Sequence, residues 1–145
     1  MAQSCPISFN RIDSNLVRII ALQVIVVSFF LLLSSNLLFA YLLLFDFSVR
    51  TLNIKKISPF ILVANFFLKI FQIQPQLCDE APKRFALYLG LGIVGFVTLL
   101  LLFSFVKIAM FLTIILILCA SFETLFDYCI GCKIYYLLQI LSKEN

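Results

Sequence analysis

The sequence predicts an all-α membrane protein, and three observations support this fold class. Of the 145 residues, 63% are hydrophobic and 12% are charged, against roughly 45–50% and about 25% in an ordinary soluble domain. The apolar residues also gather in runs long enough to cross a bilayer, and the basic residues gather in the segments between those runs. So few charges cannot cover a water-facing surface, which excludes a soluble enzyme. The 17 Phe residues exclude a disordered chain.

Four apolar runs predict four transmembrane helices arranged as two hairpins in a single domain, 1–145. An α-helix rises about 1.5 Å per residue, so roughly 20 residues cross the hydrocarbon core. The polar triplet Ser34-Ser35-Asn36 separates the first pair of runs, and Ser104 to Lys107 separates the second pair. The first run is expected to remain as an anchor, because no small-residue cleavage motif follows it. The predicted spans are residues 16–33, 37–53, 85–105 and 108–128.

The segment between the two hairpins predicts an amphipathic helix at about 58–74. Ser58-Pro59 is a helix-start signal, since Ser caps helix N-termini and Pro is favoured in the first turn. Polar residues then recur at spacings of four, three and four, and form one stripe with Phe and Ile residues off it. The apolar part is too short to span and contains a lysine, so we expect it to lie in the membrane interface. The stripe consists of Asn65, Lys69, Gln72 and Gln76.

The distribution of basic residues predicts the orientation. With four spans, Lys107 is the one basic residue between the last two spans, and the other ten lie in the segments that share the opposite face. Cytoplasmic segments carry the excess of Lys and Arg in membrane proteins. We therefore expect a multi-pass protein of the inner membrane with both termini in the cytoplasm. Four of the basic residues are expected to face anionic lipid: Lys55, Lys56, Lys83 and Arg84.

Five charged residues fall inside or near the predicted spans, all in the cytoplasmic half. Asp46 and Arg50 are four residues apart, a spacing at which a carboxylate and a guanidinium meet on one helix face. Charged groups in membranes face the bundle interior and are often paired. The pattern predicts a buried polar cluster that either locks helix packing or relays protons and tunes nearby thiols. Its members are Arg18, Asp46, Arg50, Glu123 and Asp127.

The cysteines supply the remaining candidate chemistry. Cys129 and Cys132 stand three apart near the end of the last span, and Cys5 precedes the first span on the same side. Such a pair can form a disulfide, bind a soft metal or exchange with a partner thiol. A helix C-terminus disfavours a thiolate, but a new helix from Lys133 to Leu141, with Gly131 ending the long one, would restore a favourable N-terminal environment.

A metal centre is the competing interpretation of these thiols. Cys5, Cys78, Cys129 and Cys132 would make a four-thiolate set suited to zinc or an iron–sulfur cluster. The chain lacks the second Cys-x-x-Cys motif of such sites, so we expect no metal and no other cofactor. Phosphate-binding loops and nucleic-acid-binding patches are also absent from the sequence.

Several short motifs, taken in order, resemble the bacterial membrane family called domain of unknown function 4395. The resemblance covers nearly the whole chain and implies a small multi-span protein with an N-terminal Cys-Pro and a C-terminal Cys-x-Gly-Cys. An association with thioredoxin-like or rhodanese-like partners is also implied by the resemblance. The matching residues are Cys5-Pro6, Asn15 to Arg18, Asp46-Phe47 with Arg50, Ser58-Pro59, Lys83 to Ala86, and Glu123 through Cys129 to Lys133.

Together these observations predict a cytoplasm-facing thiol cluster that exchanges disulfides or carries a persulfide for a soluble partner. The alternatives are a non-catalytic scaffold subunit and a transporter of small sulfur species. Transport through four short helices would require an oligomer.

Overall fold

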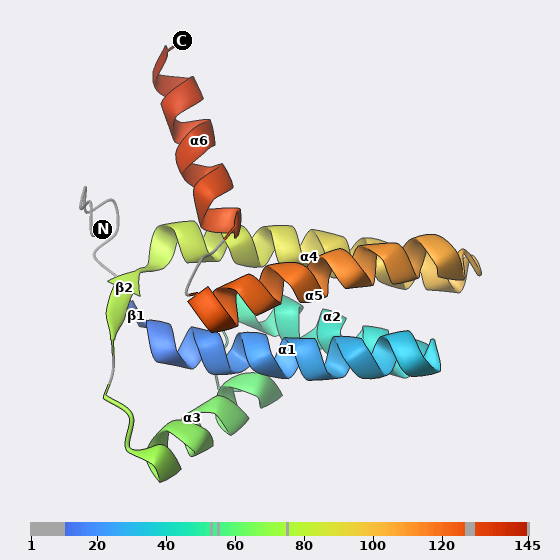
Figure 1. The fold of residues 1–145 in the computed structure, drawn as a ribbon, viewed down its shortest axis with the longest axis horizontal. Helices are drawn as coiled ribbons and strands as arrows, with labels where there is room; N and C mark the ends of the chain where they lie inside the picture. Colours follow the sequence, from blue (N-terminus) through green and yellow to red (C-terminus); the bar gives the residue numbers. More distant parts are fainter. Residues whose placement is uncertain (1–10, 53, 55, 75, 127–129, 145) are drawn as a thin grey trace.

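The computed structural model is a helical bundle from which two shorter helices project (Figure 1). It describes residues 11–52, 54, 56–74, 76–126 and 130–144. Within these ranges the chain forms six α-helices and one pair of three-residue strands. The elements in chain order are β1 (Arg11–Asp13), α1 (Ser14–Ser34), α2 (Leu37–Thr51), α3 (Pro59–Phe71), β2 (Leu77–Asp79), α4 (Glu80–Leu102), α5 (Val106–Phe126) and α6 (Ile130–Glu144).

Four helices form a closed ring in which each neighbour runs antiparallel to the next (Figure 1). Helix α1 packs against α2 and α5, and α4 packs against the same two helices from the other side. The two predicted hairpins, α1–α2 and α4–α5, are therefore both present. Short connections between antiparallel neighbours are typical of such bundles.

Small and hydroxyl-bearing side chains let these helices approach closely. Ala40 and Ala109 are almost completely buried, and so are Thr98 and Thr113. Each threonine hydroxyl donates to the carbonyl four residues earlier in its own helix, at 2.8 Å, so burial leaves no hydroxyl proton unused. Small residues are typical of helix contacts inside membranes, where close backbone packing replaces the hydrophobic effect.

The two hairpin turns lie at one end of the bundle, as the sequence predicts. Ser35 adopts a left-handed conformation (φ 48°) and its N–H donates to Leu31 at 2.8 Å, which ends α1. The side chain of Asn36 then accepts from the N–H of Leu38 at 3.1 Å and caps α2. Ser104, also left-handed (φ 64°), makes the second turn.

The opposite end of the bundle holds a strand pair that the sequence does not predict. β1 and β2 are antiparallel, with Ile12 opposite Cys78. Asp13 caps α1 by accepting from the N–H of Asn15 at 3.0 Å, and the same oxygen accepts from the N–H of Gln76 at 3.1 Å. This carboxylate therefore fixes the start of α1 to the segment that leads into α4. Strands of three residues are too short to show a hydrophobic period.

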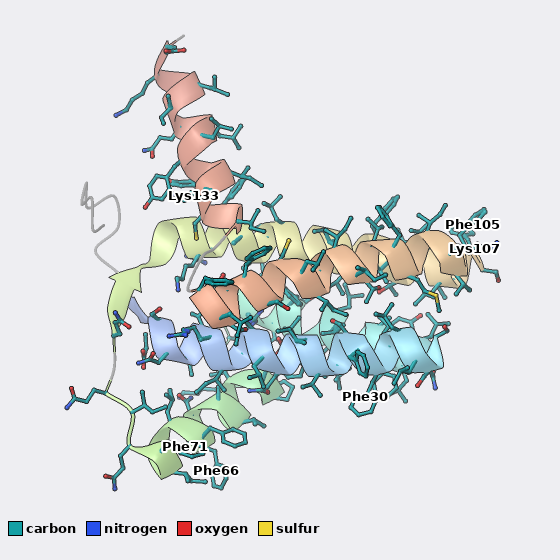
Figure 2. The ribbon with its side chains drawn as sticks, viewed as in Figure 1. Phe30, Phe66, Phe71, Phe105, Lys107 and Lys133 are labelled. Atoms are coloured by element: carbon teal, nitrogen blue, oxygen red, sulfur yellow. The ribbon has the colours of Figure 1, made fainter. Side chains whose placement is uncertain are left out.

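Helix α3 begins at the predicted signal but ends earlier than predicted. Ser58 is its N-cap and Pro59 its first residue. Gln72 is left-handed (φ 48°) and closes the helix, so Gln76 of the expected polar stripe lies outside it. The first turn packs against α1, where Gln23 donates to the carbonyl of Phe60 at 3.1 Å. Phe66 and Phe71 point away from the bundle (Figure 2).

Helix α6 starts against α4 and then leaves the side of the bundle (Figure 1). A Cβ added at Gly131 would lie 2.5 Å from the Cβ of Ala86 and 2.7 Å from its Cα. The aromatic rings of Tyr135 in α6 and Phe85 in α4 also pack together, with 5.6 Å between their centroids. Glycine is thus required where the first turn of α6 crosses α4.

Three helices of the described chain are long and apolar enough to cross a membrane. They are α1, the Lys83–Leu102 part of α4, and α5. Helix α2, the second predicted span, has 15 residues, which corresponds to about 22 Å against a hydrocarbon core of about 30 Å. The apolar surfaces of the three long helices indicate a lipid bilayer environment.

The contact at Gly131 predicts a stability difference between two glycine variants. We expect Gly131→Ala to lower the melting temperature of the full-length protein in detergent, because the Cα of Ala86 is backbone and cannot rotate aside. The matched control is Gly92→Ala, since a Cβ added at Gly92 meets nothing within 4 Å. Ala is favoured over Gly in a helix by about 1 kcal/mol, so this control should be neutral or stabilising. Equal stability of the two variants would contradict the assigned contact.

Candidate functional site

A polar cluster joins α2, α3, α4 and α5 at the end of the bundle opposite the hairpin turns. Asp46 is its centre and is completely buried (0% exposed). Its Oδ2 lies 3.2 Å from the Nε of Arg50, one turn later on the same helix. The sequence-based prediction that these two residues meet is therefore confirmed.

Asp46 also fixes the start of α3. The hydroxyl of Ser58 donates to Oδ1 of Asp46, and the backbone N–H of Phe60 donates to the same carboxylate. Ser58 Oγ in turn accepts from the N–H of Ile61 at 3.4 Å. A carboxylate at a helix N-terminus is stabilised by the unpaired N–H groups and the helix dipole. One carboxyl group thus holds two helices and one guanidinium.

A second ion pair extends the cluster to α4 and α5. Lys83 Nζ lies 3.5 Å from Glu123 Oε1, and both side chains are 13% exposed. Glu123 also attracts Arg50 electrostatically. The two ion pairs therefore belong to one group of alternating charges, and the buried polar cluster expected from the sequence is present.

Lys83 differs from its sequence-based assignment as a lipid-facing basic residue. Its side chain is mostly buried and pairs with Glu123. A signal for this pair exists in the sequence, because Lys83 and Glu123 lie about twenty residues on either side of the turn at Ser104. Residues equally distant from an antiparallel turn lie at the same depth. Lys56 is exposed and Arg84 is half-buried, and Lys55 lies outside the described residues.

Arg18 contributes to the same end of the bundle through a backbone carbonyl. Its Nε and Nη2 donate to the carbonyl oxygen of Thr124 at 3.1 and 3.0 Å. Thr124 lies in the last turn of α5, where carbonyl groups have no partners within the helix. A positively charged guanidinium there also interacts favourably with the negative end of the helix dipole. Arg18 thereby fastens α1 to α5 one residue from Glu123.

Cys132 lies in the first turn of α6, next to α4. A separate C-terminal helix is present, as the sequence suggested, but it begins at Ile130 and not at Lys133, so Gly131 lies inside its first turn. Gly131 contacts Ala86, which is three residues, or about one turn, from Lys83. The thiol is half-buried. Cys119 is also half-buried but lies within α5.

Four predicted site residues, Cys5, Lys55, Asp127 and Cys129, lie outside the described residues. The sequence interpretation missed several contacts that shape the site, including the Lys83–Glu123 pair and the bond from Arg18 to Thr124. It assigned Ser58 as a helix cap without its bond to Asp46, and it did not predict that Gly131 would meet Ala86. Neither long-range contact has a local signal in the sequence.

The fold and the site define a small helical protein with three helices able to cross a membrane and a polar cluster at one end of them. Residues 12–139 match the family model described as Domain of unknown function (DUF4395). The chain belongs to this family. Comparisons with curated proteins and with solved structures gave no match.

Because the Asp46 carboxylate is buried, replacing it with an amide of the same size should strongly lower the stability of the protein. We expect Asp46→Asn to lower the free energy of unfolding by about 3 kcal/mol, because breaking a buried ion pair leaves the other charge uncompensated. Ser58→Ala should cost less, about 1 kcal/mol for loss of a cap, since Asp46 keeps Arg50 and Phe60. Chemical denaturation of the full-length protein in mixed micelles measures both. Ser48→Ala is the control, since the hydroxyl of Ser48 donates to the carbonyl of Leu44 in its own helix at 2.7 Å. An Asp46→Asn variant as stable as this control would refute the assigned role.

The Lys83–Glu123 pair predicts energetic coupling between α4 and α5. In a double-mutant cycle with Lys83→Gln and Glu123→Gln, we expect a coupling energy of about 1 kcal/mol, as is typical of contacting charged residues. Denaturation of the single and double variants measures it. Lys107 is the control cation, because it lies at the other end of the bundle (Figure 2) and should show no coupling to Glu123. Additive effects in the Lys83 cycle would exclude the ion pair.

Proposed function

We propose that this protein exchanges disulfides, or carries a persulfide, for a soluble protein at the basic end of the bundle. The observation that carries the proposal is the place of Cys132. It lies in the first turn of α6, beside the charged cluster and away from the centre of the bundle. A thioredoxin-like or rhodanese-like protein is the class of partner that fits a pair of vicinal cysteines.

The proposal includes four transmembrane helices with both termini in the cytoplasm, in the inner membrane. Helix α2 completes the ring with α1 and α4, and the charges that weaken its hydropathy, Asp46 and Arg50, neutralise each other. These facts support α2 as the fourth span despite its length. In this arrangement α3 lies in the interface, with its exposed Phe side chains toward lipid.

The orientation is supported by the positions of the described basic residues. Lys107 lies at the end with the hairpin turns, and Lys133 lies near the opposite end (Figure 2). The other described basic side chains lie near the start of α1, at the end of α2, between α2 and α4, near the start of α4, or in α6. The side with the excess of Lys and Arg is the cytoplasmic side in membrane proteins. Apart from Lys107, these residues are Arg18, Arg50, Lys56, Lys69, Lys83, Arg84, Lys133 and Lys143.

The proposed exchange proceeds in two balanced steps. A thiolate of the Cys129–Cys132 pair attacks one sulfur of a partner disulfide, and the other partner sulfur leaves as a thiolate. The second cysteine of the pair then attacks the mixed disulfide, which oxidises the pair and releases the reduced partner. The first turn of a helix favours negative charge, so the start of α6 suits a thiolate better than the end of α5. Cys5 is a further candidate thiol on the same side.

The paired charges support a second candidate function, a non-catalytic scaffold subunit. Asp46, Arg50, Lys83 and Glu123 are engaged with one another, as expected for residues that fix helix packing. In a scaffold, the cysteines would be replaceable by serine without loss of partner binding.

Cysteine variants distinguish the two functions. We expect Cys132→Ser to abolish disulfide exchange with a model thioredoxin-like substrate while the melting temperature stays unchanged, because Ser retains the size but not the nucleophilicity of Cys. Cys119→Ser is the matched control and should retain exchange. Exchange that survives the loss of Cys132 would refute the role assigned to this thiol. No exchange by the unsubstituted protein, together with partner binding that Cys132→Ser retains, would favour the scaffold.

Labelling with a membrane-impermeant maleimide tests the placement of the pair. In inverted vesicles we expect Cys132 to react, and to react more after reduction if a disulfide forms with Cys129. In intact cells it should not react. Reaction from outside the cell would overturn the proposed orientation.

A further inference from the structure

Helix α6 has an apolar face that no other part of the described chain covers. Its apolar side chains recur at spacings of three, four and seven, the period of an amphipathic helix. None of the residues of α6 is buried. The exposed fractions are 40% for Ile134, 58% for Leu137, 49% for Leu138 and 51% for Leu141.

The opposite face of α6 carries polar side chains, and Ile140, which is 59% exposed, lies between the two faces. Cys132, Gln139 and Lys143 follow one another at seven and four residues, which places them on one side of the helix. Lys133 and Lys143 lie near the two ends of the helix, and Tyr135 and Tyr136 lie between them. Lys and Tyr side chains are typical of helices at a membrane surface, where apolar stems enter the lipid and polar tips reach water.

The position of α6 relative to the bundle identifies what covers its apolar face. The long helices α1, α4 and α5 define the direction across the bilayer, and α6 leaves the side of the bundle at its basic end (Figure 1). A helix that leaves a transmembrane bundle sideways at its end runs along the membrane surface. With 15 residues, or about 22 Å, it is also too short to span.

We propose that α6 lies in the membrane interface with Ile134, Leu137, Leu138 and Leu141 in the lipid. The occupant of this apolar face is the phospholipid of the same leaflet. On α4, the exposed side chains of Tyr88 and Leu89 lie two and three residues beyond the crossing point at Ala86. Anionic headgroups attract Lys133 and Lys143.

This placement directs Cys132 toward the aqueous side of α6. The thiol lies on the face opposite the lipid-embedded stripe, where a soluble protein can reach it. The inference extends the proposed function but does not depend on it, because lipid contact of α6 requires no chemistry at the thiol. The interfacial placement of α6 and the thiol function can fail separately. If α6 lies in the interface but Cys132 does not react, α6 is a membrane-anchoring helix and only the thiol function is refuted.

Depth-dependent quenching tests the proposal on the full-length chain. An environment-sensitive fluorophore is attached at Leu137→Cys or at Gln139→Cys, with the native cysteines replaced by Ser, in vesicles of phosphatidylcholine and phosphatidylglycerol. A nitroxide on the lipid acyl chain should quench the probe at position 137 several-fold more than the probe at 139. Aqueous iodide should show the reverse order.

Further sites keep the test decisive if one variant fails to fold. Ile134→Cys and Leu141→Cys should behave like Leu137→Cys, and Lys143→Cys like Gln139→Cys. Phe96→Cys on the exposed side of α4 is the lipid reference, and Lys56→Cys is the aqueous reference. Equal iodide quenching at 137 and 139 would place α6 in water and overturn the proposal. Protection of position 137 from both quenchers would mean that a protein, such as a second copy of this chain, covers the face, and would overturn it as well.

Discussion

The carboxylate of Asp46 joins helix α2 to the start of helix α3. It is fully buried, it lies 3.2 Å from Arg50, and it accepts hydrogen bonds from Ser58 and Phe60 at the start of α3. A buried charge is costly unless partners surround it. The partners come from two helices, so the charge is stable only when α3 is docked. The docking of α3 is therefore required for the Asp46 carboxylate of α2 to be buried.

The other ionic contacts extend this arrangement around the ring. Glu123 attracts Arg50 and pairs with Lys83, and Arg18 binds the carbonyl of Thr124 in the adjoining turn of α5. Five helices thus meet through polar contacts at one end, while the middle of the bundle is packed by small and apolar side chains. In a bilayer, where apolar burial between helices brings little free energy, such contacts favour one arrangement over others. The same end presents the start of α6 and Cys132.

Local sequence signals predicted several of the features that depend on neighbours in the chain. The turns at Ser35 and Ser104, the cap at Ser58 and the pairing of Asp46 with Arg50 all follow from spacings of four residues or fewer. Helix limits were less accurate: α3 ends at Phe71 because Gln72 is left-handed, and α4 begins at Glu80, ahead of the hydropathic run. The strand pair was missed, since three-residue strands carry no periodic signal. The Asp13 cap was missed although its signal is local, an Asp directly before the helix.

The sequence by itself determined that this is a helical membrane-type chain, where its apolar helices lie, and which end carries the positive charge. These properties depend on the amino-acid composition and on periodicity over a few residues, and both can be read directly from the sequence. Only the tertiary structure decided that Lys83 meets Glu123, that Ser58 binds Asp46, and that Gly131 crosses α4 at Ala86. Each of these contacts joins residues distant in sequence, and its existence depends on how the helices are rotated about their axes. That rotation is set by the packing of all four bundle helices together.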